Sequence, residues 1–185
     1  QRVIGQLQGR ITYKLSNNRI LKVEHDSEGL NPRSDDNLGT IVSWHSRYTI
    51  GEENVNKHDY ISTQDAVKSN SSKDDIIIPL YIYDHSGITI STTKFSCSYD
   101  SAQFGFIKIS KEKIRNEYSV KRVSSKLIER IKTYLINEVN SYDQYLTGES
   151  YIMSITKNDE EEESCCGFLG NDIKDNGILD NLSIE

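Results

Sequence analysis

The sequence predicts an α+β domain, in which one long amphipathic helix packs on a face of a mainly antiparallel sheet. Two stretches lead to this prediction. Residues 76–106 contain two apolar runs separated by a short polar turn, followed by small polar residues and a further apolar run. Residues 125–147 carry apolar side chains at steps of three and four, which is the spacing that forms one face of a helix.

The first stretch predicts a β-hairpin whose strands cover residues 76–83 and 88–92. β-Branched and aromatic residues dominate the first run, and this composition favours a strand over a helix. The connecting turn reads Asp-His-Ser-Gly, so Gly87 is expected to have a positive φ. Because the hairpin is the most apolar part of the chain, we expect it at the centre of the sheet, with Leu80 and Ile82 facing the long helix.

Four further runs have the composition of strands, and they cover residues 19–25, 40–45, 105–109 and 151–156. Residues 26–39 are dense in Gly, Pro, Asn and Asp, which set or tolerate turn conformations, so a long loop is predicted there. Residues 1–15 alternate only weakly between apolar and polar residues, and we expect either a strand pair or an arm.

Short helices are expected where a serine hydroxyl can accept hydrogen bonds from the first free backbone N–H groups. Ser62 and Asp65 have the spacing of a capping box, which predicts a helix over residues 63–69. Ser110 is expected to cap a second short helix that ends near Tyr118.

The long helix is predicted to begin at Ser124 or Ser125 and to end at Gly148, which would serve as a left-handed cap. Its apolar stripe consists of Leu127, Ile131, Tyr134, Leu135, Val139, Tyr142 and Leu146. These elements suggest one domain over residues 20–170, preceded by an arm or extra strands over 1–19 and followed by a tail over 171–185.

The net charge of −6 argues against direct binding to nucleic acid, which needs clustered Lys and Arg. Basic residues do gather over 108–132, but glutamates interrupt them, as on a solvated helix face. The acidic run Asp159, Glu160, Glu161, Glu162 and Glu163 is expected to form an extended, hydrated loop. These five residues are our candidates for binding a basic partner, although most such runs are only solvated loops.

Three cysteines, Cys97, Cys165 and Cys166, do not suffice for a disulfide framework, and we expect reduced thiols in a cytoplasmic protein. No apolar run approaches the eighteen residues of a membrane-spanning helix, so no membrane association is expected. The sequence also lacks a phosphate-binding glycine loop and the common zinc-protease and hydrolase motifs. We therefore expect no cofactor.

One group of residues has the composition of a nucleophilic site, namely Cys97, His85, Asp84 and Asp100. A thiolate beside an imidazole that a carboxylate orients is what cysteine nucleophiles require. The alternative, which we favour, is that Asp84 and His85 close the hairpin through backbone amides while Cys97 packs as a small apolar residue.

Zinc binding is a weaker interpretation of the same residues. His45, His85, Cys97 and Cys165 would have to supply the ligands, but no two of them have the spacing that is typical of zinc sites. We therefore expect no metal.

Five blocks of sequence occur in an order that resembles a family of small uncharacterised proteins common in bacteriophages and other bacterial mobile elements. They are DDNLGTIVSWHSRYTIG (36–51), IPLYIYDHSGITIST (78–92), FSCSYDSAQFGFIKISKEKIRNEY (95–118), YDQYLTGESY (142–151) and ESCCGFLG (163–170).

The resemblance implies a phage-encoded accessory protein in the cytoplasm of the bacterial host. By analogy with other small acidic phage proteins, it would act by binding, and thereby inhibiting, a host protein such as a nucleic-acid or defence enzyme. The alternative is a small cysteine-dependent hydrolase that uses Cys97 and His85. The sequence gives no indication of the oligomeric state.

Overall fold

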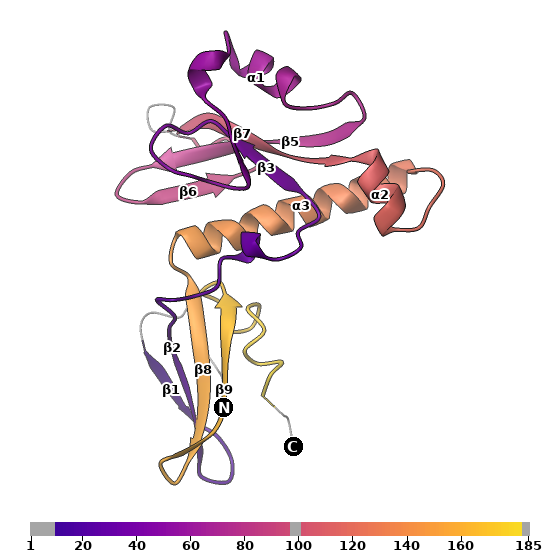
Figure 1. The fold of residues 1–185 in the computed structure, drawn as a ribbon. Helices are drawn as coiled ribbons and strands as arrows, with labels where there is room; N and C mark the ends of the chain where they lie inside the picture. Colours follow the sequence, from indigo (N-terminus) through magenta and orange to yellow (C-terminus); the bar gives the residue numbers. More distant parts are fainter. Residues whose placement is uncertain (1–9, 97–100, 183–185) are drawn as a thin grey trace. The chain divides into compact units, whose positions relative to one another are not determined.

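The structure of the protein is a computed structural model that describes residues 10–96 and 101–182. The chain forms two compact units, which are described separately (Figure 1). Unit 1 consists of Gln1–Asn31 and Gln144–Glu185, and unit 2 of Pro32–Asp143. Over the described residues the strands form two mostly antiparallel sheets and a long helix accompanies them, which confirms the predicted α+β class.

The sheet of unit 2 has the strand order β4-β3-β7-β5-β6 within the described residues. Its strands are β3 (Thr40–Ser43), β4 (Glu53–Asn54), β5 (Asp75–Asp84), β6 (Ile88–Ser91) and β7 (Ser101–Ser110). The prediction that the β5–β6 hairpin lies at the centre was wrong, because β7 pairs with both β3 and β5 and β6 lies at an edge. β7 is less apolar than β5, but it has five buried residues against three in β5, and it is longer than the predicted strand over 105–109.

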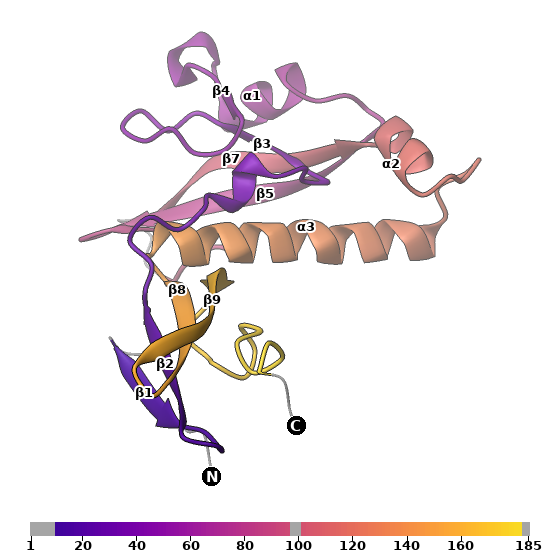
Figure 2. The same ribbon diagram turned by 60° about the horizontal axis from the view of Figure 1, so that its bottom comes forward.

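The long helix α3 (Ser125–Leu146) covers one face of this sheet, and α1 (Thr63–Ser69) covers the other (Figure 2). A Cβ added to Gly39 would lie 2.5 Å from Leu135 of α3 and 2.7 Å from Ile107 of β7, so helix and sheet are in close contact there. Leu80 pairs with Gly105, two residues before Ile107, and therefore lies on the face that α3 covers.

Ile82 is buried as well, and its cross-strand neighbour Ile90 donates a backbone hydrogen bond to the Asp143 carboxylate of α3 at 2.7 Å. Both hairpin residues predicted to face the helix are buried in unit 2, and the strand register places Leu80 on the face that α3 covers. On the opposite face, Val42, Trp44 and Phe106 pack against Ala66 of α1.

The predicted helix starts are confirmed at all three serines. The hydroxyls of Ser62, Ser110 and Ser124 accept from backbone N–H groups three residues later, at 3.1, 3.0 and 3.2 Å. Ser110 begins α2 (Lys111–Glu117). α3 ends as predicted before Gly148, whose φ is +77°. In its stripe Ile131, Leu135, Val139 and Tyr142 are buried, whereas Tyr134 is 40% exposed.

A buried ion network ties the long loop of unit 2 to the helix and the sheet. The Arg33 side chain is only 3% exposed, and it donates to Glu52 at 2.6 Å and to Glu138 of α3 at 3.1 Å. Burial alone would lower the pKa of Arg33, but the hydrogen bonds and charges of both glutamates raise it above its usual value. The guanidinium therefore stays charged, and it needs its carboxylate partners.

The same two carboxylates also hold backbone groups of the loop. Glu138 accepts from the N–H groups of Leu38 and Gly39 at 2.6 and 3.1 Å, and Glu52 accepts from that of Ile41 at 2.6 Å. These bonds place the start of β3, so they also position the residues that follow β3.

The sheet of unit 1 has the order β1-β2-β8-β9 over the part of the chain that the structure describes. Its strands are β1 (Ile11–Lys14), β2 (Arg19–His25), β8 (Ser150–Lys157) and β9 (Glu160–Leu169). Ile173 and Ile178, which follow β9, are fully buried against Leu21, Tyr151 and Met153.

The predicted arm (1–19) thus includes β1, and the predicted tail (171–185) contributes to the core of unit 1. Where independently folding domains begin and end stays a prediction.

The expectation of an acidic loop over residues 159–163 was wrong, because Glu160–Glu163 belong to β9, which pairs with β8. Asn158 and Asp159 both have positive φ, +51° and +67°, as in the two-residue turns that join hairpin strands. The side chains from Glu160 to Gly167 are all exposed and contribute no buried packing. Backbone hydrogen bonding to β8 therefore holds this part of the strand in place.

In the β5–β6 turn, Gly87 has a positive φ as predicted, but at +151° it lies far from the left-handed helical region. Ser86, at +58°, is the residue in that region. We therefore expect both Gly87→Val and Gly87→Asn to cost about 1–3 kcal/mol. Ser86→Asn should change stability by less than about 0.5 kcal/mol, because asparagine tolerates this conformation. Urea denaturation of the three variants tests this, and a tolerated Gly87→Asn would contradict it.

Candidate functional site

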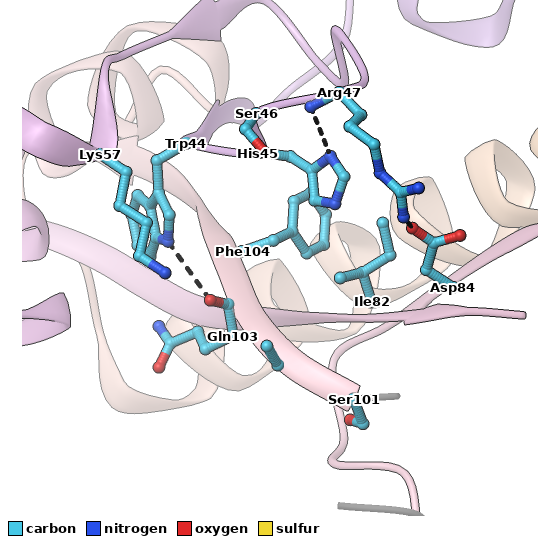
Figure 3. A pocket seen from close by; sticks show the side chains of 11 residues that line it. Trp44, His45, Ser46, Arg47, Lys57, Ile82, Asp84, Ser101, Gln103 and Phe104 are labelled. Atoms are coloured by element: carbon cyan, nitrogen blue, oxygen red, sulfur yellow. Dashed lines mark hydrogen bonds and ion pairs between the residues drawn. The ribbon is translucent and has the colours of Figure 1, made fainter. Parts of the chain in front are cut away.

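The end of β5 brings together residues that the sequence did not connect. Asp84, the last residue of β5, forms an ion pair with the Arg47 guanidinium, which comes from the segment after β3 (Figure 3). The expectation that Asp84 would bond backbone amides of its own turn was therefore wrong, since its partner among the described residues is Arg47. His85 lies in the turn itself, with its ring 6.1 Å from that of Tyr83.

Of the four candidate catalytic residues, the structure places Asp84 and His85. Cys97 and Asp100 lie outside the described residues, so a thiol–imidazole pair stays a prediction.

A cavity beside Asp84 has a volume of about 340 Å³ and opens between the segment after β3, the start of β7 and the end of β5. Three of its lining residues carry charge, and they are Arg47, Lys57 and Asp84. The others named in Figure 3 are Trp44, His45, Ser46, Ile82, Ser101, Gln103 and Phe104.

His45 is held in one orientation at the wall of the cavity. Its Nδ1 accepts from the backbone N–H groups of Arg47 and Tyr48 at 3.3 and 3.2 Å, and its ring stacks on that of Tyr48. A neutral imidazole that accepts at Nδ1 carries its proton on Nε2. Nε2 has no hydrogen-bond partner among the described residues, and is therefore available as a donor.

The charge of the His45 imidazole is set by its surroundings. Burial lowers the pKa of His45 below its usual value, the charge of Asp84 opposes this shift, and the charges of Arg47 and Lys57 add to it. His45 is therefore neutral at pH 7, and the cavity keeps the positive charges of Arg47 and Lys57 against the one negative charge of Asp84.

Lys57 and Trp44 complete the wall opposite Asp84. The Trp44 indole donates to the Gln103 carbonyl at 3.3 Å, which fixes its ring at the edge of the cavity. No acidic group among the described residues lies within ion-pair distance of the Lys57 ammonium, which lines the same cavity as Trp44 (Figure 3). The cavity thus offers a free cation and a histidine donor to a ligand.

Sequence reasoning missed Arg47, Lys57 and Trp44 as site residues, and considered His45 only as a zinc ligand. A usable signal was present, because the single tryptophan of the chain is followed directly by His45 and two residues later by Arg47. Polar and aromatic residues that follow the end of a buried strand often line a site.

The five acidic candidates lie in unit 1, at the β8–β9 turn and on β9. β9 pairs with β8 on one side only within the described residues, so it is an edge strand. Lys157 of β8 lies 3.9 Å from Glu162, and it is the basic residue within ion-pair distance of these acids in the described chain. Cys165 and Cys166 follow on the same strand as exposed free thiols.

Within residues 10–96 and 101–182, no three His, Cys, Asp or Glu side chains lie close enough together to hold a metal ion. None of the helices described has the length and apolar content to span a bilayer.

Comparisons of the chain with protein-family models, with curated proteins and with solved structures found no match. The resemblance to bacteriophage proteins therefore rests on its five sequence blocks.

Proposed function

We propose that this chain is a phage-encoded accessory protein that acts by binding a host protein through the acidic edge strand β9. The observation that carries the proposal is the run of eight exposed residues from Glu160 to Gly167 on an edge strand. The sequence resemblance supports the phage origin. A host enzyme that acts on nucleic acid, or one that serves in defence, is the expected target, because such enzymes present basic surfaces.

The backbone of β9 supplies the first element of binding. A strand that pairs on one side only leaves alternate N–H and C=O groups on its outer edge free to hydrogen-bond to an added strand. Since Glu160 to Gly167 are exposed on both faces, no described side chain blocks the approach of a partner along this edge.

The charge of β9 supplies the second element, which is selectivity. Asp159 and Glu160–Glu163 place five negative charges at one end of the edge, and Lys157 offsets one of them. Two copies of β9 would repel each other if they paired, so the strand disfavours self-association and selects a partner that carries Lys and Arg. The same charge attracts such a partner over a distance and raises its association rate.

The alternative function, a cysteine-dependent hydrolase, has less support. Asp84 is engaged by Arg47 rather than by His85, and the surroundings of Cys97 lie outside the described residues. Nothing in the described site favours this alternative.

Changing Asp159 to Asn and Glu160–Glu163 to Gln tests the proposal. We expect binding to a host target, captured from lysate with the wild-type chain and then purified, to slow at least tenfold at 50 mM salt. The difference should shrink as salt shortens the screening length to roughly 8 Å at 0.15 M. The melting temperature should change by less than about 2 °C, because exposed charges add little to folding.

A matched control removes the same number of exposed acids elsewhere, at Asp35, Asp36, Glu112, Glu117 and Glu129. The control variant should bind like the wild type, and so should Cys97→Ala. Equal slowing in both charge variants would show that net charge, rather than β9, controls binding. If the β9 variant kept full biological activity while folded Cys97→Ala lost it, the hydrolase would be the correct function.

A further inference from the structure

We propose that unit 2 contains a second site, in which a small amphiphilic organic anion binds across Trp44 and Lys57. Its oxyanion, a carboxylate or a phosphate, would lie in the polar cavity beside Asp84, and its apolar part in an adjoining cavity. This inference does not depend on the proposed function of β9, which lies in unit 1.

The adjoining cavity has a volume of about 430 Å³ and lies between the segment after β4 and α1. It shares Trp44 and Lys57 with the polar cavity, so the two adjoin at these residues. Its wall is more apolar than that of the polar cavity but also contains polar groups, and its other lining residues are His58, Tyr60, Ile61, Ser62, Thr63 and Ala66. One ligand of modest size can therefore meet both cavities, with its polar end on one side of Lys57 and its apolar end on the other.

The polar cavity has donors suited to an oxyanion. The Lys57 ammonium has no acidic partner among the described residues, and its charge is available to a ligand. Nε2–H of His45 and the Ser46 hydroxyl line the same cavity and can donate to the remaining oxygens. Asp84 does not cancel the attraction, because its charge is already balanced by the ion pair with Arg47.

The adjoining cavity contains the least buried large apolar side chain of those described. Ile61 is 98% exposed, whereas the other exposed large apolar residues, Leu30, Tyr48 and Tyr134, range from 37% to 75%. It lies at the rim, beside Tyr60 and the end of the Lys57–Asp59 turn. A bound apolar group would cover Ile61 and remove this surface from water.

Trp44 is the only tryptophan in the chain, so its fluorescence reports directly on both cavities. The full-length protein is titrated at constant ionic strength with phenyl phosphate, benzoate, inorganic phosphate and benzyl alcohol. We expect saturable changes with phenyl phosphate, benzoate or both, with a dissociation constant of about 1–10 mM for so small a probe. Comparing the two organic anions shows whether the site binds a phosphate, a carboxylate or both. Inorganic phosphate should bind more weakly, and benzyl alcohol should bind weakest.

Two variants, Lys57→Met and Ile61→Ser, together with the control Lys68→Met, test which part of the site binds each end of the ligand. Lys57→Met keeps the length of the side chain and removes its charge, so affinity for the organic anions should fall about five- to tenfold. Lys68→Met removes the same charge from an exposed position of α1 outside the cavities, and should leave affinity unchanged. Ile61→Ser should weaken phenyl phosphate and benzoate by about threefold while leaving inorganic phosphate unaffected.

The pH dependence gives an independent readout. Protonation of His45 adds a positive charge, so benzoate, which stays ionised, should bind more tightly as the pH falls below about 6.5. The charged groups that act on His45 are Asp84, Arg47 and Lys57. The proposal is overturned if neither organic anion gives a saturable change, if benzyl alcohol binds as well as they do, or if Lys57→Met and Lys68→Met weaken binding equally.

Discussion

Replacing Glu138 with alanine is expected to lower the free energy of unfolding of unit 2 by about 3–5 kcal/mol. The carboxylate accepts from the Arg33 guanidinium and from the backbone N–H groups of Leu38 and Gly39, at 2.6–3.1 Å. Its loss removes the side-chain acceptor of the two backbone N–H groups and leaves Arg33 with one carboxylate instead of two. Arg33 is buried, so water cannot replace the lost carboxylate as its partner. The guanidinium also cannot lose its proton, so its positive charge remains in the interior.

The measurement is urea denaturation followed by the fluorescence of Trp44, which lies in unit 2 and is the only tryptophan. Glu129→Ala on the same helix is the control, since Glu129 forms an exposed ion pair with Lys132 at 2.9 Å. The control should cost less than about 0.5 kcal/mol. A cost below 1 kcal/mol for Glu138→Ala would mean that the loop keeps its position without the network.

This network also shows what the sequence did not reveal. Arg33 lies in a stretch rich in Gly, Pro, Asn and Asp that is predicted as a long loop, and the structure places it in a short 3-10 helix (Pro32–Ser34) within that stretch. Its two carboxylate partners are 19 and 105 residues away, so no local pattern connects them to Arg33. The cavity around His45, Arg47 and Lys57 was missed for the same reason, because strand pairing and ion pairs between distant segments assemble it.

Local chemistry, by contrast, was predictable. A serine followed by a helical pattern marks a cap whatever the tertiary fold, and Ser62, Ser110 and Ser124 all act in that way. The order of strands in the sheet, by contrast, depends on pairing between segments that are far apart in the sequence. β7 is the central strand because it pairs with both β3 and β5. Its pairing with β5 continues past a register shift after Leu80, and therefore beyond residues 105–109, the run that was predicted as a strand.

The acidic segment shows how composition can mislead. Four successive glutamates have low strand propensity, so they were interpreted as a loop. The deciding residues were Asn158 and Asp159, whose positive φ values form a hairpin turn and direct the following residues back along β8. Both turn residues are visible in the sequence, but the prediction included only Asp159, as part of the acidic loop.

The largest effect is expected for Leu135→Asp, which should unfold unit 2. Leu135 is fully buried against the sheet, so the substitution removes its apolar contacts and places a carboxylate where no partner is in position to compensate it. The cost should exceed about 4 kcal/mol, which is beyond the range of most single substitutions and comparable to the whole stability of a small domain. Circular dichroism and Trp44 fluorescence should both report loss of structure.

Tyr134→Asp is the matched control, because Tyr134 is the neighbouring residue on α3 and is 40% exposed. Its hydroxyl accepts from Arg130 one turn earlier, and an aspartate at this position can pair with the same guanidinium. We therefore expect a change below about 1 kcal/mol. The two adjacent positions thus differ in burial rather than in helix propensity, and the comparison isolates the contribution of packing on the sheet. A Leu135→Asp protein that stayed folded and changed only its oligomeric state in size-exclusion chromatography would show that the stripe of α3 serves as an interface between chains instead.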